Sequence, residues 1–375
     1  MIRDGSARTS RLGALSVPEV AAGQQHGEIR GAVPPSQHHG EIQGAVPPRQ
    51  HHGEIQGTVP PGQHSGGIRG VVPLGQHRPA PASVLVIAGI VSVQLGAGLA
   101  GRLFAELGPA GVTGLRLWWS ALIVAAAGGR PAIRAVRAVV ASRSWSDLLV
   151  VLAFGVVLGV MNFSIYQSFA RIPLGVAVTI EFLGPLVVAV ASSRRPLDAA
   201  WVVLAGAGVV LLTEGGAGQA GHASGAGPVL GLSTEAAGVA FALVAAACWA
   251  GYILLSRATG RRFGGSSGLV IAMVVAAALV TGPAVAAAGP ALARPAVIGA
   301  GLAIGLLSSV IPYRLELEAL RRVPAHVFGI WMSLEPAVAA LIGLALLGET
   351  LLARQWLAIA LVIVACAGAA RHSTG

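Results

Sequence analysis

The sequence contains no lysine, because arginine supplies all 25 basic residues of its 375. A P-loop requires a lysine after its glycine-rich turn, so ATP use through that motif is excluded. Only two cysteines are present, Cys248 and Cys366, and neither has a histidine or cysteine at metal-ligand spacing. No disulfide, metal or other cofactor site is therefore expected in the apolar part of the chain. Charged residues make up only 11% of the sequence, against about 25% in typical soluble domains.

The sequence is instead strongly apolar. Hydrophobic residues account for 54% of it, and the mean hydropathy is +0.74. The chain is long enough for about ten membrane spans, so it is predicted to be an all-α polytopic membrane protein in contact with the lipid bilayer. Its formal charge of +10 does not indicate nucleic acid, because the arginines lie between apolar segments or in the N-terminal tail and form no basic patch interleaved with aromatic residues.

Residues 1–82 form a tail of different composition, with a 13-residue repeat visible at Gly27, Gly40, Gly53 and Gly66. A unit this rich in proline, glycine, glutamine and histidine buries too little apolar surface to fold, so disorder is predicted. One interpretation is metal binding by the histidines. The other, which we favour, is an expanded tandem repeat in the DNA, upstream of the functional start codon. The histidines concerned are His38, His39, His51, His52, His64 and His77.

From Ser83 onwards the chain alternates between short connections and apolar runs, each long enough to cross a membrane as a helix. The predicted spans are 83–101, 111–129, 147–169, 172–192, 197–213, 235–256, 268–288, 296–316, 325–347 and 354–370. They group into a first five-helix repeat at 83–213 and a second at 235–371, separated by a glycine-rich extracytoplasmic loop at 214–234.

Arginines gather in alternate connections, for example Arg130 to Arg143 and Arg257 to Arg262. The positive-inside rule places these connections, and both termini, in the cytoplasm. Because five spans is an odd number, the second repeat would enter the membrane upside down relative to the first. Ten helices in two inverted five-helix repeats is a common architecture of secondary transporters, whose site lies at the midplane.

The repeat is clearest in two segments that hold charge within apolar surroundings. Residues 171–185 read RIPLGVAVTIEFLGP and residues 322–336 read RVPAHVFGIWMSLEP, with one carboxylate in each copy, Glu181 and Glu335. A charge at the centre of a membrane helix costs about 2.5–3.5 kcal/mol on insertion scales, so it marks a pathway or site by default. Glu181 is the first candidate for substrate binding or coupling.

Further candidates follow from helical spacing, which puts Asn162 and Tyr166 on one face. For several candidates a structural role stays open. Glu181 could pair with Arg116, Glu335 could support the kink at Pro336, and Arg116 could snorkel at the outer end of its span. Trp249 and Tyr252 could simply pack. The complete candidate set for substrate binding or coupling is Glu181, Asn162, Tyr166, Gln167, Trp249, Tyr252, Tyr313, Glu335 and Arg116. Glu316 and Glu318 are expected to pair with nearby arginines, and Glu349 to end its helix or to pair with Arg354.

Three segments support a family resemblance: TGLRLWWSALI at 113–123, ARIPLGVAVTIEFLGPL at 170–186, and the stretch from IPYRLELEAL to LIGLALLGETL at 311–351. They resemble the EamA-type branch of the drug/metabolite transporter superfamily, and within it bacterial inner-membrane exporters of threonine and homoserine. The resemblance implies ten helices, two repeats, a central cavity and efflux of small amino acids driven by the proton gradient. Arg314 departs from the family pattern and puts the lining of its span in doubt.

The leading hypothesis is therefore a bacterial inner-membrane exporter of small amino acids that works by alternating access. One alternative keeps the fold and changes the cargo to another metabolite or a cationic drug. A second alternative, a membrane-embedded transferase, requires paired acidic residues for a metal ion, and the closest pair, Glu316 and Glu318, is flanked by arginines. The sequence does not indicate an oligomeric state.

Overall fold

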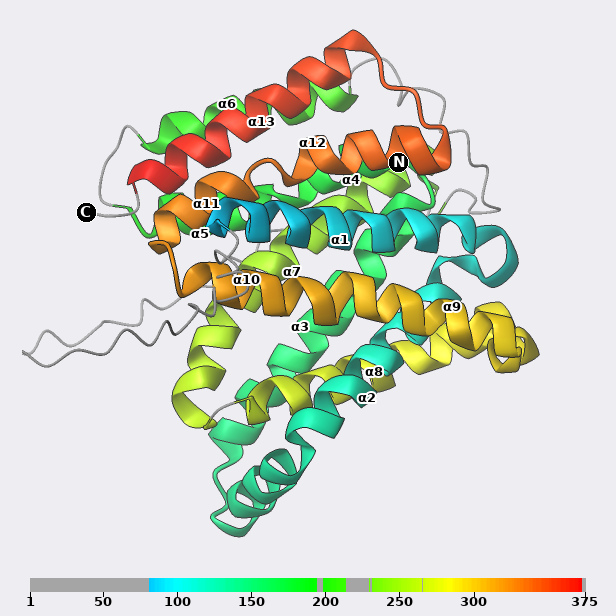
Figure 1. Ribbon diagram of the computed structural model, residues 1–375, viewed down its shortest axis with the longest axis vertical. Coiled ribbons are helices and arrows are strands. Elements are labelled where there is room, and N and C mark those ends of the chain that lie inside the picture. Colours follow the sequence, from blue (N-terminus) through cyan, green and yellow to red (C-terminus); the bar gives the residue numbers. More distant parts are fainter. Residues whose placement is uncertain (1–80, 194–197, 214–228, 230, 265, 373–375) are drawn as a thin grey trace, which may run out of the picture. The chain divides into compact units, whose positions relative to one another are not determined.

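The computed structural model describes residues 81–193, 198–213, 229, 231–264 and 266–372, and these are helical apart from their connections and one isolated bridge (Figure 1). The expected N-terminal repeat tail, the arginines at 194 and 195 and most of the expected loop at 214–234 lie outside the described residues.

The helices of the first half are α1 (Ala82–Arg102), α2 (Phe104–Ala141), α3 (Trp145–Phe169), α4 (Leu174–Glu181), α5 (Leu183–Ala191) and α6 (Ala199–Thr213). Those of the second half are α7 (Thr234–Arg262), α8 (Ser267–Ala288), η2 (Gly289–Ala293), α9 (Pro295–Gly305), η3 (Leu306–Val310), α10 (Ile311–Leu320), α11 (Ala325–Met332), α12 (Glu335–Ile342), η4 (Gly343–Leu347) and α13 (Ala353–His372). The elements η3 and η4 are single π-helical turns.

In the described part of the chain, eight helical segments are long and apolar enough to cross a membrane. A ninth is added if α2, which bends by 88° between Phe104–Ala126 and Gly128–Ala141, counts as one span. The predicted span at 197–213 coincides with α6, which has only 15 residues. The chain is thus an all-helical, multi-pass membrane protein, while ten spans in inverted repeats stays a prediction.

Both copies of the repeated segment fold into a broken helix with the same local geometry. Pro173 and Pro324 precede the first pieces, α4 and α11, with extended backbone angles of φ −54°, ψ 142° and φ −59°, ψ 149°. A proline lacks the N–H that would donate to the carbonyl four residues earlier. Pro185 therefore frees the carbonyl of Glu181, where α4 ends, and Pro336 frees that of Met332, where α11 ends.

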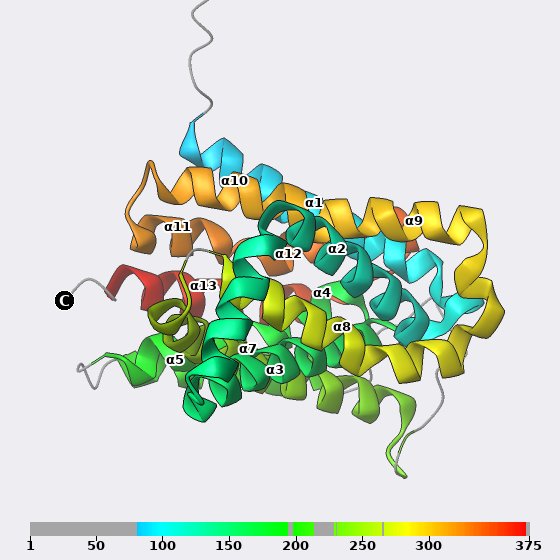
Figure 2. The ribbon, with the colours of Figure 1, turned by 90° about the horizontal axis from the view of Figure 1, so that it is seen from below.

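Packing joins elements of the first half to elements of the second. The helix α1 lies along α10, α2 lies along α8, α3 packs on α7, and α6 packs on α13 (Figures 1 and 2). Small residues permit close approach, as they commonly do between membrane helices. A Cβ on Gly175 would lie 2.6 Å from the Cβ of Ala340, and one on Gly184 would lie 2.2 Å from the carbonyl oxygen of Ala246. The broken helices are thereby held tightly against the opposite half.

Candidate functional site

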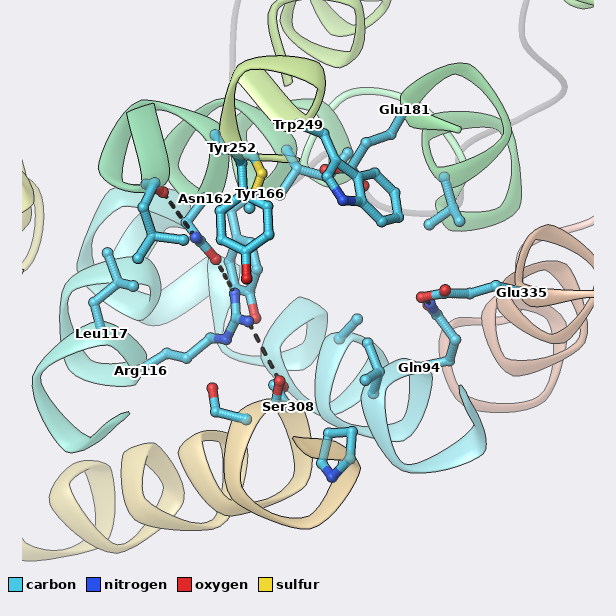
Figure 3. Close-up of a pocket in the computed structure, with 18 of the residues that line it drawn as sticks. Gln94, Arg116, Leu117, Asn162, Tyr166, Glu181, Trp249, Tyr252, Ser308 and Glu335 are labelled. Carbon is cyan, nitrogen blue, oxygen red and sulfur yellow. Dashed lines mark hydrogen bonds between the residues drawn. The ribbon is translucent and has the colours of Figure 1, made fainter. Parts of the chain in front are cut away.

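A cavity of about 270 Å³ lies where the two halves meet, lined by residues of α1, α2, α3, α4, α7, α8, η3, α10, α11 and α12 (Figure 3). Its wall combines apolar and aromatic side chains with a few charged and amide groups. Arg116, Asn162 and Ser308 lie on one side of it, and Gln94 and Glu335 on the other. We call these two groups the arginine pole and the glutamate pole.

The arginine pole is held by an ordered set of contacts. Arg116 donates from Nη1 to Oδ1 of Asn162, and its guanidinium lies 5.3 Å from the centre of the Tyr166 ring. Asn162 in turn donates from Nδ2 to the carbonyl of Leu158 at 2.8 Å, which turns the amide oxygen toward Arg116. The cation is thus positioned by hydrogen bonds and by an aromatic face, without a carboxylate partner within ion-pair distance among the described residues.

The backbone of η3 completes this pole. Pro312 cannot donate to the carbonyl of Ser308, four residues earlier, and a π-helical turn forms at this point. The freed Ser308 carbonyl instead faces Nη2 of Arg116 at 3.5 Å. The side-chain hydroxyl of Ser308 has no hydrogen-bond partner, and a Cβ on Gly96 would lie 2.2 Å from it. Glycine at that position lets α1 approach η3.

The glutamate pole links the middle of α1 to the second helix break. Gln94 donates from Nε2 to Oε1 of Glu335 at 2.9 Å. Both side chains are buried, with exposed fractions of 2% and 7%. Since the amide nitrogen is used by Glu335, the orientation of the Gln94 amide is fixed, and its oxygen is left without a partner.

Aromatic residues form the remaining wall, next to Glu181 at the end of α4 (Figure 3). Trp249 makes an edge-to-face contact with Phe182, with ring centres 5.0 Å apart. The hydroxyls of Tyr252 and Tyr313 lie 3.2 Å apart and join α7 to α10. This wall offers apolar area and the negative faces of aromatic rings, which attract cations.

Eight of the nine predicted site residues line this one cavity, and Gln167 does not. The residues of α3 that line the cavity cover one face of the helix, and they are Leu158, Met161, Asn162, Ile165, Tyr166 and Phe169. Gln167 lies beyond the edge of that face because each residue turns the helix by 100°. Gln167 instead accepts a hydrogen bond from Arg171 at 2.8 Å. Two structural alternatives were also wrong. Arg116 lines the cavity instead of snorkelling at a helix end, and Glu181 makes no ion pair with it.

The expected pairing of the α10 carboxylates holds for only one of them. Glu318 contacts Arg322 at 2.6 Å and Arg321 at 3.4 Å, whereas Glu316 faces the cavity. Arg314 is exposed and is not among the residues that line the cavity.

Sequence reasoning did not include several lining residues among its candidates. Gln94 had one visible signal, since it is an isolated amide in the apolar run at 83–101. Ser308 had another, because it lies four residues before Pro312, the spacing at which a proline frees a carbonyl. The residues concerned are Gln94, Ser308, Ser309, Glu316, Met161, Met273 and Met332.

A second cavity of about 310 Å³ adjoins the first and is lined mainly by apolar residues of α5, α7, α11 and α13. Trp249 and Met332 line both cavities. These two side chains therefore lie between the two cavities.

Within the described ranges no group of three or more histidine, cysteine or acidic residues could hold a metal ion.

Comparison with known proteins places this geometry in a family. Residues 236–371 match the model of the EamA-like transporter family. The threonine/homoserine exporter RhtA of Escherichia coli (strain K12) is 40% identical over 285 residues, which cover 76% of this chain and 90% of that exporter. The chain belongs to the EamA-like transporter family. It is thus related to transporters.

Two further relatives align over different shares of the chain. The threonine/homoserine exporter RhtA of Salmonella typhimurium (strain LT2) is 39% identical over 288 residues, covering 77% of this chain and 90% of the relative. The uncharacterized transporter YwfM of Bacillus subtilis (strain 168) is 30% identical over 173 residues, which cover 46% of this chain and 54% of that protein. The resemblance noted in the sequence is therefore confirmed at the level of the family.

Proposed function

We propose that this EamA-like transporter exports small amino acids such as threonine and homoserine across a bacterial inner membrane. The observation that carries the proposal is the 40% identity to named threonine/homoserine exporters over 90% of their length. The central cavity is consistent with this cargo. An amino acid carries one negative and one positive group. The cavity has Arg116 on one side, opposite in charge to the carboxylate of the cargo, and Glu181 and Glu335 elsewhere on its wall, opposite in charge to the ammonium group.

The transport cycle we propose is alternating access, coupled to the proton gradient. Two inverted halves, 83–213 and 235–371, joined by the connection at 214–234, would rock about the cavity, with both termini in the cytoplasm. The packing between the halves supports this proposal, because it is reciprocal. The first helix of the first half, α1, packs on α10 in the third span of the second half, and the first helix of the second half, α7, packs on α3, the third span of the first half. Glu181 is the residue we assign to proton uptake.

One observation favours a second cargo on the same fold. Three carboxylates, Glu181, Glu316 and Glu335, line the cavity against the single cation Arg116. With the aromatic wall, this arrangement also suits an organic cation. Export of cationic compounds in place of amino acids is therefore the alternative that the same assay must include.

The test is efflux from preloaded cells that express the full chain, measured with labelled threonine, labelled homoserine and a labelled organic cation. We expect efflux of both amino acids, loss of efflux with a protonophore, and loss in Glu181→Gln. The matched control is Glu106→Gln, the same substitution at an exposed carboxylate that pairs with Arg294 at 2.6 Å. Efflux of the cation alone would assign the alternative cargo, and efflux of none of the three, with the protein present in the membrane, would refute the proposal.

A further inference from the structure

Unpartnered polar atoms mark one feature of the cavity that the contacts within the protein do not explain. Oε1 of Gln94, Nε of Arg116 and Oγ of Ser308 are all buried and have no hydrogen-bond partner among the residues that the structure describes. Leaving such a group unsatisfied is unfavourable, so each calls for a partner such as a water molecule or a ligand. All three residues line the same cavity.

The chemistry of these atoms differs between the two poles. Nε of Arg116 can only donate, while Oε1 of Gln94 can only accept. Because Gln94 Nε2 is engaged by Glu335 at 2.9 Å, the amide cannot turn over without breaking that bond and placing two acceptors together. The arginine pole thus holds an unpartnered donor, and the glutamate pole holds an unpartnered acceptor. A ligand that satisfies both carries an acceptor group at one end and a donor at the other.

Charge decides which donor the glutamate pole selects. The acceptor of Gln94 lies beside the carboxylate of Glu335, on the side of the cavity away from Arg116. An ammonium group is attracted there by the charge of the carboxylate, and it can donate to Oε1 of Gln94 and to an oxygen of Glu335. A neutral hydroxyl group can form a hydrogen bond but gains no such charge attraction. An ammonium group therefore fits this pole better than a hydroxyl group.

We infer that Gln94 is a substrate-binding residue whose Oε1 accepts a hydrogen bond from the α-ammonium group of the transported amino acid, while the carboxylate of that substrate lies at Arg116. This inference rests on the proposed function, since it takes an amino acid as cargo. It assigns Gln94 as a specificity residue that requires an N–H donor, in addition to the charge requirement set by Glu335.

The test is uptake of labelled threonine into inverted membrane vesicles, in which an exporter faces the medium with its cytoplasmic side. Unlabelled N-methylthreonine, N,N,N-trimethylthreonine and valine serve as competitors. N-methylthreonine keeps both charge and N–H donors, and the trimethyl compound keeps only the charge. For the wild type we expect N-methylthreonine to compete like threonine and the trimethyl compound to compete about tenfold more weakly, the factor typical of a hydrogen bond to a charged group.

In Gln94→Met, a substitution of similar size without an acceptor, we expect the apparent affinity for threonine to fall about tenfold, with little change for the trimethyl compound. The matched control is Gln167→Met, a buried glutamine of α3 that does not line the cavity, which should keep the wild-type ratio.

Equal competition by threonine and the trimethyl compound in the wild type would overturn the inference even if Gln94→Met did not fold. The inference would also be overturned if Gln94→Met abolished the preference for threonine over valine and left the preference for threonine over the trimethyl compound unchanged, because Gln94 would then recognise the hydroxyl group. If the wild type takes up no threonine, the proposed function itself fails. Failure of the proposed function is therefore distinguishable from failure of the inference about Gln94.

Discussion

The carboxylate of Glu349 is predicted to hold the start of α4 against the other half of the protein. It is 4% exposed and accepts a hydrogen bond from the backbone N–H of Leu174 at 2.8 Å. That N–H lies in the first turn of α4, where backbone N–H groups have no acceptor within the helix. In Glu349→Ala the buried N–H loses its acceptor, which costs about 1–3 kcal/mol of folding free energy.

This contact also predicts a pH dependence with a definite sign. Burial raises the pKa of Glu349 from 4.5 to about 7, although the hydrogen bond from Leu174 acts in the opposite direction. The folded protein therefore holds this proton more tightly than the unfolded chain does. The resulting stability is fully present below about pH 4, is lost as the pH rises to about 7, and amounts to about 3 kcal/mol. Glu349→Gln keeps an acceptor oxygen but removes the titration.

Thermal unfolding of purified protein in detergent, followed by tryptophan fluorescence at pH 5 and pH 8, measures both effects. Glu349→Ala should unfold at a lower temperature than the wild type at pH 5. Glu349→Gln should match the wild type at pH 5 and exceed it at pH 8. The reasoning is refuted if Glu349→Ala is as stable as the wild type at pH 5, or if the difference between the wild type and Glu349→Gln is the same at both pH values.

Further predictions concern helix breaks, close packing and the surface. Pro312→Ala restores a donor for the Ser308 carbonyl, so we expect folded protein with reduced transport; unchanged transport would show that this break is dispensable. Gly184→Ala places a methyl group 2.2 Å from the carbonyl oxygen of Ala246, so the yield of folded protein in gel filtration should drop sharply, and a normal yield would contradict the tight packing. Glu318→Gln removes the exposed ion pairs with Arg321 and Arg322, which stabilise little because solvent screens them, and should leave efflux and melting temperature near wild type; a large loss in either would indicate a role beyond these pairs.

Much of the local structure could be predicted from proline positions. Pro185 and Pro336 lie four residues after Glu181 and Met332, where α4 and α11 end, because a missing N–H frees the carbonyl one turn earlier. The presence of most apolar helices was equally accessible, since length and apolarity decide which segments cross a membrane, but their limits were not: the span expected at 111–129 lies within the longer helix α2, Phe104–Ala141. The bend within α2 was not expected from its composition.

The set of side chains that share the cavity was only partly predictable. Asn162 and Tyr166 were placed together by their spacing on one helix, whereas the exclusion of Gln167 follows only once the full set of lining residues defines the width of that face. The contact between Gln94 and Glu335 joins residues of different halves, and no periodicity within one helix reports on such a pair. Membrane helices are apolar on every side, so the face that meets the cavity leaves no amphipathic pattern in the sequence.

The most direct test of the central claim uses the purified protein reconstituted into liposomes. Uptake of labelled threonine and of labelled homoserine would be measured with and without an imposed pH gradient, in wild type, Arg116→Gln and the surface variant Glu106→Gln. The account predicts gradient-driven uptake by the wild type and Glu106→Gln, and none above protein-free liposomes for Arg116→Gln. Wild-type protein that takes up no threonine or homoserine under either condition, while remaining folded in the liposomes, would contradict the account.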